Sequence, residues 1–206
     1  MMLVGRGIVP VVVIDDAAQA PGLVAALAAG GIRCAEITMR TDAGIDAIRA
    51  ATDSLGDADF VVGAGTVLTG ADVDRAVDAG ARFIVSPGLD DEVLARSASH
   101  DVPIVPGVAT ATEVQRALRA GLDHLKLFPA GVLGGLPMIS ALAGPFPQVR
   151  FLPSGGVSPA NAAEYAASPH VFAVSGSWMA PRDLIAAGDW AEITARSRAA
   201  MDLVGA

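Results

Sequence analysis

Short runs of β-branched and apolar residues recur along the whole chain and alternate with Ala-rich stretches typical of helices. The runs begin near Ile8, Cys34, Phe60, Phe83, Val102, His124, Val149 and Val171. Successive starts are 19 to 26 residues apart, which leaves room for one strand and one helix each time. The pattern therefore predicts a chain built from alternating β and α units.

Eight such units in 206 residues leave little length for long loops. A closed (β/α)8 TIM barrel, one domain spanning 1–206, leaves no strand edge unpaired. An open doubly wound sheet is the alternative, but no strand is followed by the Gly-x-Gly-x-x-Gly turn of dinucleotide-binding proteins. Helix starts agree, since Thr110 to Glu113 can form a capping box and Ser158-Pro159 places a cap before a first-turn proline.

Composition narrows the class of protein. Hydrophobic residues make up 52% and aromatic residues 4%, the mix expected where helices pack over buried parallel strands. No apolar run approaches the roughly 18 residues of a membrane span, and we expect no signal peptide. Cys34 is the only cysteine and cannot form an internal disulfide, which favours a cytoplasmic protein.

The net charge of −8 comes without a basic stripe, so nucleic acid binding is not expected. No group of His, Cys, Asp and Glu has metal-ligand spacing, and we expect neither a metal nor a cofactor. An anionic substrate would have to be bound by local groups, because the overall field opposes it.

Barrel enzymes carry their active sites at the C-terminal ends of the strands, so polar residues at those ends are the candidates. Side chains alternate along a strand, which places Glu36 and Arg40 on one face of the second strand. By the same rule Lys126 and Phe128 share a face of the sixth strand, and Thr66 ends the third.

Lys126 is the only lysine among the 14 basic residues, and it lies between Leu125 and Leu127 in an apolar strand. Desolvation lowers the pKa of a buried amine and makes it a usable nucleophile, which a guanidinium cannot become. The alternative is structural: an ion pair with Glu36, or a side chain that extends to the barrel rim.

Glu36 and Arg40 each allow two interpretations. A carboxyl in a half-apolar barrel mouth suits a general acid and base, but Glu36 could instead serve as a structural partner for Arg40 or Lys126. The guanidinium of Arg40 could bind a carboxylate or phosphate through two parallel hydrogen bonds, or it could be a surface arginine at a strand end.

Two glycine turns follow the last two strands. Gly155-Gly156, with Ser158-Pro159 opening a helix, resembles a phosphate cradle in which backbone N–H groups face the anion. Gly176-Ser177 follows the eighth strand, and barrels often bind phosphate with these two loops. A single Gly-Gly turn is weak evidence, but the matched positions strengthen it.

Taken in order, these stretches resemble the bacterial 2-keto-3-deoxy-6-phosphogluconate and 4-hydroxy-2-oxoglutarate aldolases. The similarity runs from about Ile8 to Trp190. The matching stretches are Ile8-Val-Pro-Val-Val, Glu36-Ile-Thr-Met-Arg-Thr41, Val62-Gly-Ala-Gly-Thr-Val67, Ser86-Pro-Gly88, His124-Leu-Lys-Leu-Phe-Pro-Ala130, Pro153-Ser-Gly-Gly-Val-Ser-Pro159 and Ser175-Gly-Ser-Trp178.

The resemblance implies a metal-free class I aldolase, a homotrimer of barrels that cleaves a 2-keto acid, which can be a phosphorylated sugar acid. It implies that Lys126 forms the Schiff base and that Glu36 moves protons. Arg40 and Thr66 match the groups that hold the pyruvate carboxylate.

The same resemblance assigns the phosphate to Gly155-Gly156 and Gly176-Ser177. Ser154 stands where threonine is common, and it keeps the hydroxyl that contacts substrate. Phe128 is expected against the pyruvate methyl, although core packing would explain it equally well. Gly131 departs from the glutamate of many members, which puts loop contacts in doubt but no step of the chemistry.

Two other functions remain open at this point. A phosphate-binding barrel isomerase or epimerase would share the glycine turns but would use paired acids or metal ligands. A non-catalytic barrel that senses phosphorylated sugars would keep the turns without needing Lys126 and Glu36 together.

Overall fold

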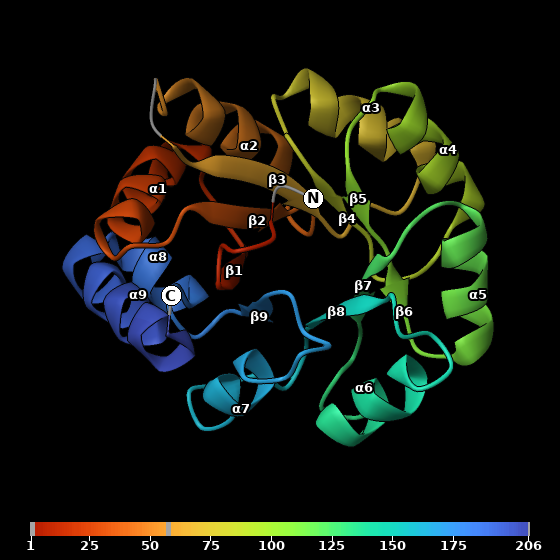
Figure 1. The fold of residues 1–206 in the computed structure, drawn as a ribbon. Helices are drawn as coiled ribbons and strands as arrows, with labels where there is room; N and C mark the ends of the chain where they lie inside the picture. The colour runs from red at the N-terminus through yellow and green to blue at the C-terminus, as the bar shows by residue number, and fades with distance from the viewer. Residues whose placement is uncertain (1–2, 57–58, 206) are drawn as a thin grey trace.

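The computed structural model describes residues 3–56 and 59–205, in which a ring of helices surrounds an inner ring of strands (Figure 1). Residues 1–2, 57–58 and 206 of the expected 1–206 domain lie outside the described residues. The strands are β1 (Ile8–Val12), β2 (Cys34–Thr38), β3 (Val61–Gly65), β4 (Ile84–Val85), β5 (Ile104–Val105), β6 (Gly107–Val108), β7 (His124–Leu127), β8 (Arg150–Pro153) and β9 (Val174–Gly176). The helices are α1 (Ala20–Ala29), α2 (Gly44–Asp53), α3 (Gly70–Asp78), α4 (Asp91–Ser99), α5 (Ala111–Arg119), α6 (Leu136–Ala143), α7 (Ala162–Ala166), α8 (Arg182–Ala187) and α9 (Trp190–Val204), with a 3-10 turn, η1 (Ala17–Gln19), before α1.

The strands pair in parallel in the orders β5-β4-β3-β2-β1-β9 and β6-β7-β8. Pro106 separates β5 from β6 because proline has no N–H to donate, so these two labels mark one strand of the barrel. A bridge between Phe151 and Val171 joins β8 to the segment that leads into β9. The predicted (β/α)8 barrel with its eight strands is confirmed, and the open doubly wound alternative is wrong.

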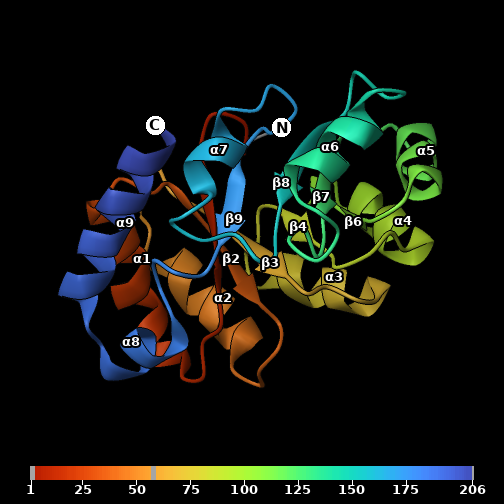
Figure 2. The same ribbon diagram turned by 90° about the horizontal axis from the view of Figure 1, so that it is seen from below.

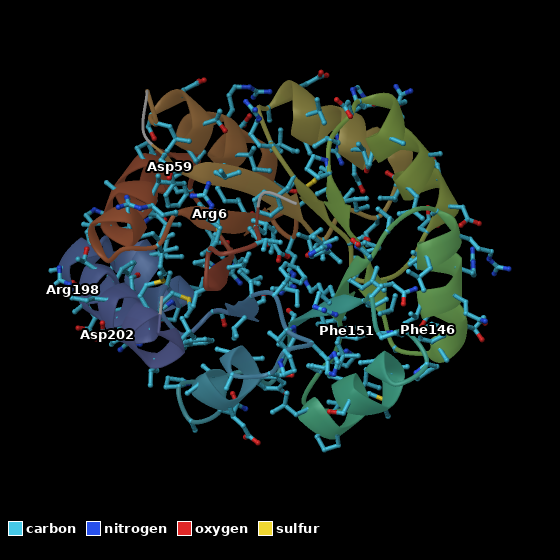
Figure 3. All side chains as sticks on the ribbon, in the orientation of Figure 1. Arg6, Asp59, Phe146, Phe151, Arg198 and Asp202 are labelled. Atoms are coloured by element: carbon cyan, nitrogen blue, oxygen red, sulfur yellow. The ribbon has the colours of Figure 1, made fainter. Side chains whose placement is uncertain are left out.

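Alternation along the strands creates two cores. Side chains facing the barrel axis form an apolar cluster inside the ring, and the opposite faces pack against the helices. The buried members of the inner cluster are Leu3, Val9, Cys34, Phe83, Val85, Val105, Leu152 and Ala173. Side chains fill the centre of the ring in the view down its axis (Figure 3), so the interior is a packed core and not a pore.

Side-chain caps fix the starts of α3, α4, α5 and α9. Thr110 accepts a hydrogen bond from the N–H of Glu113 at the start of α5, as expected, while the Glu113 carboxylate accepts from the N–H of Ala109. The expected helix start at Ser158-Pro159 is wrong. The Asn161 side chain accepts from the N–H of Ser158 and closes a turn there, so α7 begins only at Ala162.

Both chain ends lie at one end of the barrel, and α8 lies at the other (Figure 2). Val204 and Gly205 line a cavity together with Gly5 and Gly7. The strands run away from this end, so the loops that follow them lie remote from the termini. Within residues 3–56 and 59–205, no helix has the length and apolar character needed to cross a membrane.

Candidate active site

Lys126 and Glu36 meet inside the barrel. Lys126 lies on β7 and Glu36 on β2, and the two residues are 90 positions apart in the sequence. Lys126 Nζ lies 3.3 Å from Glu36 Oε1. The two residues are 3% and 0% exposed. Leu125 and Leu127 belong to the outer core, so Lys126 faces the axis as alternation predicts.

Gly65 leaves the space that the Glu36 carboxylate occupies, since a Cβ built on it would lie 2.2 Å from Glu36 Oε1. Two other glycines on nearby strands allow close packing of other groups. A Cβ built on Gly63 would overlap the Phe83 ring at 2.4 Å, and one built on Gly107, which pairs in register with Lys126, would lie 2.0 Å from the Pro87 carbonyl oxygen. The Glu36 side chain can therefore take its place only because β3 carries no side chain at Gly65.

Burial makes the two groups depend on each other. An isolated buried charge is strongly unfavourable, and each group supplies the partner that the other requires. Among the described residues Glu36 Oε2 is fully enclosed and has no hydrogen-bond partner. The carboxylate thus has one oxygen on the amine and a second that can accept or give a proton at a ligand.

Phe128 links the lysine to the first glycine turn. Lys126 Nζ lies 5.4 Å from the centroid of the Phe128 ring, within the range of a cation–π contact. The same ring lies 3.4 Å from the position of a Cβ built on Gly155. The half-buried ring therefore lies between the amine and the turn after β8.

Arg40 and Thr66 are brought together at the ends of β2 and β3. Arg40 is exposed, and its Nε donates to Thr66 Oγ1 at 3.0 Å. Thr66 has a φ of 59°, which is uncommon for a β-branched residue and costs about 1–3 kcal/mol. Such strain is typical of functional sites, and here it accompanies a side chain that holds a guanidinium at the barrel mouth.

The turn after β8 presents its backbone to solvent. Gly155 and Gly156 have φ values of 85° and 83° and are exposed, a conformation that favours glycine. The N–H groups of Ala130 and Gly131 donate at 2.8 Å to the carbonyls of Ser154 and Gly155, which fixes the turn against the loop after β7. With the helix start at Ser158-Pro159 wrong, any anion site here depends on the glycine N–H groups and not on a helix terminus.

The second predicted turn lies at the end of β9. Ser177 is exposed, and a Cβ built on Gly176 would overlap the Trp178 ring at 1.8 Å. Trp178 therefore packs over this turn. His124, at the start of β7, forms an edge-to-face contact with Phe172 at 4.9 Å, near the apolar inner cluster.

Gly131 lies beside the glycine turn at Gly155-Gly156. A Cβ built on it would lie 3.2 Å from Gly156 Cα and 3.3 Å from the Gly155 carbonyl oxygen. Sequence reasoning missed Gly65, Gly107 and Ser175. The first two matter only through contacts with neighbouring segments of the barrel, whereas alternation could have found Ser175, which lies beside Ser154.

Comparison with known proteins gives a consistent result. The model of the KDPG and KHG aldolase family matches residues 2–196. A 2-dehydro-3-deoxy-phosphogluconate aldolase of Treponema pallidum is 48% identical over 96% of this chain and 93% of its own length. The KHG/KDPG aldolase of Escherichia coli K12 is 42% identical over 95% of this chain and 91% of its own.

A solved structure of KDPG aldolase from Legionella pneumophila, with pyruvate captured as a covalent carbinolamine intermediate, superposes with a TM-score of 0.91. The two sequences are 40% identical, and the superposition covers 96% of this chain and 95% of the Legionella chain. A thiamine phosphate pyrophosphorylase from Pyrococcus furiosus, 13% identical with a TM-score of 0.71, shares the fold alone. The family match and these relatives, which span almost the whole chain, agree, and the chain belongs to the KDPG and KHG aldolase family.

Proposed function

We propose that this protein is a class I aldolase that cleaves 2-keto-3-deoxy-6-phosphogluconate to pyruvate and glyceraldehyde 3-phosphate. The same machinery would cleave 4-hydroxy-2-oxoglutarate to pyruvate and glyoxylate. The observation that carries the proposal is the enclosed pair of Lys126 and Glu36, 3.3 Å apart inside the barrel. Relatives that cover nearly the whole chain are named for these activities.

Schiff-base formation begins with the neutral amine of Lys126. The amine attacks carbon 2 of the keto acid, and the carbonyl oxygen takes up a proton to give a carbinolamine. Glu36 supplies that proton and then takes back one of the two protons on the Lys126 nitrogen. It returns this proton to the departing hydroxyl, so that water leaves and a protonated imine remains. The enclosed Oε2 atom of Glu36 is the free oxygen suited to this transfer.

Cleavage uses the imine as an electron sink. Glu36 takes the proton of the hydroxyl on carbon 4, the bond between carbons 3 and 4 breaks, and its electron pair forms an enamine on Lys126. The aldehyde leaves as glyceraldehyde 3-phosphate. Protonation of carbon 3 and addition of water then release pyruvate and restore the amine, so the cycle balances without a cofactor.

Substrate binding is assigned to groups around this pair. Arg40 would hold the keto-acid carboxylate through two hydrogen bonds, with Thr66 beside it. Phe128 would cover the apolar carbon 3, which becomes the methyl of pyruvate. The remaining assignments are Ser154 to a hydroxyl, and Gly155, Gly156, Gly176 and Ser177 to the phosphate. Local N–H groups have to offset the net charge of −8, which repels an anion.

The alternatives of an isomerase, an epimerase or a phosphosugar sensor are not favoured. The curated relatives of 39% to 48% identity are named as aldolases. We further propose that residues 1–206 form one domain, that the protein acts in the cytoplasm and that it assembles as a homotrimer. A designed protein cage built from symmetric oligomeric domains, 28% identical with a TM-score of 0.85, supports an assembly, and light scattering would measure its mass.

Pyruvate release tests the proposal directly. Purified protein is mixed with 2-keto-3-deoxy-6-phosphogluconate, its galactose-series epimer or 4-hydroxy-2-oxoglutarate, and pyruvate is measured with lactate dehydrogenase and NADH. We expect turnover, and its loss in Lys126→Arg, which keeps the charge but not the nucleophile. Retained turnover in Lys126→Arg, or none with any of the three in the native protein, would reject the proposal.

A further inference from the structure

Two buried serines lie side by side at the ends of neighbouring strands, and the proposed function uses only one of them. Ser154 follows β8, and Ser175 is in β9; Ser175 Oγ donates to Ser154 Oγ at 3.5 Å. Ser175 is 0% exposed, whereas Ser154 is 5% exposed. A ligand can therefore touch Ser154, while Ser175 lies behind it.

Strand register places this pair on the inner face of the barrel. Ser175 pairs with Val9 and lies two residues beyond Ala173, and both of these belong to the inner cluster. Leu152 of β8 pairs with Lys126 of β7, and Ser154 comes two residues after Leu152, just beyond the end of β8. The glycine turn begins at the next residue, and Ser154 thus lies between the lysine level and the proposed phosphate turn.

The backbone on both sides of the Ser154 side chain is fixed. Its N–H donates to the Leu127 carbonyl at 3.1 Å, and its carbonyl accepts from the N–H of Ala130 at 2.8 Å. The remaining freedom is rotation of the side chain about Cα–Cβ and of the hydroxyl proton about Cβ–Oγ. A serine hydroxyl has one proton, and when its oxygen accepts from Ser175 that proton is left to donate elsewhere.

We propose that Ser175 is a positioning residue for substrate specificity, which acts through Ser154 to direct its proton onto the substrate hydroxyl next to the phosphate. This inference rests on the proposed function. In 2-keto-3-deoxy-6-phosphogluconate that hydroxyl is on carbon 5, and it becomes the hydroxyl of glyceraldehyde 3-phosphate. The enclosed Ser175 thus favours substrates that carry the carbon 5 hydroxyl, although Ser175 itself does not contact the substrate.

The condensation direction provides a matched pair of substrates. Pyruvate is combined with D-glyceraldehyde 3-phosphate or with 3-oxopropyl phosphate, the same aldehyde without the hydroxyl. In Ser175→Ala we expect kcat/KM for glyceraldehyde 3-phosphate to fall about five- to tenfold, the size of one neutral hydrogen bond, with no change for 3-oxopropyl phosphate. Ser175→Cys, a weaker donor, should fall between.

Ser154→Ala should lose the same discrimination, and the double variant should lose no more, because the two hydroxyls act as one unit. Ser197→Ala is the control, since Ser197 is an enclosed serine on α9 whose hydroxyl has no partner among the described residues. Equal losses with both aldehydes, or an unchanged ratio between them in Ser175→Ala, would overturn the inference. Native protein that neither condenses the aldehydes nor forms a pyruvate adduct with borohydride would instead refute the proposed function itself.

Discussion

Gly65→Ala adds one methyl group to β3, at a place where the structure has no room for it. The new Cβ would lie 2.2 Å from Glu36 Oε1, 2.4 Å from Cγ and 2.7 Å from Cδ. The strand backbone cannot easily move, because the Gly65 carbonyl accepts from the N–H of Met39 at 2.9 Å and Gly65 pairs in register with Thr38. The carboxylate has to move instead, by about 1 Å to reach ordinary contact distance.

Such a shift separates Glu36 from Lys126 and turns its free oxygen away from the ligand. A misplacement of about 1 Å in an active site costs on the order of 10²-fold in rate, so we expect kcat/KM for pyruvate release to fall by that factor. Thermal unfolding is measured in parallel to show that the variant is folded. Gly144→Ala is the control, because its Cβ would make only ordinary contacts, the nearest 3.6 Å, at the end of α6. A folded Gly65→Ala protein with native kcat/KM would refute the packing argument.

Three further predictions follow from the site and the core. Glu36→Gln should slow turnover by about 10²-fold or more while borohydride still traps some imine, and an unchanged rate would remove the carboxylate from proton transfer. Thr66→Gly should raise KM for the keto acid, because the contact assigned to the Thr66 side chain is lost. The free energy of unfolding should change by less than about 1 kcal/mol, since relief of the positive φ offsets the entropy gained by the unfolded chain. Kinetics would measure KM and calorimetry the free energy, and an unchanged KM would count against the assigned contact. Burial raises the pKa of the Cys34 thiol from 9.0 to about 12. The folded protein therefore keeps a proton that the unfolded chain loses, so the contribution of Cys34 to stability should fall by about 1.4 kcal/mol per pH unit as pH rises from 9 towards 12 and stay level below 9. Denaturant unfolding would measure this slope, which should be smaller in Cys34→Ala, and an equal slope in both proteins would contradict the prediction.

Much of this architecture was predictable from local pattern. The rhythm of apolar runs predicted all eight strands, with starts shifted by up to three residues, and alternation placed Glu36 with Arg40 and Lys126 with Phe128 on shared strand faces. Their residue types allowed a nucleophile and a general acid and base, because desolvation of a buried amine favours its neutral form, and the family resemblance supplied the aldolase chemistry.

Other features depend on contacts that a linear pattern does not contain. The absent side chain at Gly65 matters through Glu36 on the neighbouring strand, and that at Gly107 through Pro87 in the loop after β4, so their importance depends on the register of adjacent strands. Ser158-Pro159 has a typical helix-start sequence, yet the Asn161 side chain bonds the Ser158 N–H and forms a turn in its place. Local preference is overridden there by a competing side-chain hydrogen bond.

Reductive trapping measures whether Lys126 forms a covalent bond with the substrate. The protein is treated with borohydride in the presence of pyruvate, digested, and its peptides are mapped by mass spectrometry. We expect loss of activity together with a reduced pyruvyl group on Lys126 and on no other residue. An unmodified Lys126 peptide from fully inactivated protein, or full activity after treatment, would show that Lys126 does not form the Schiff base.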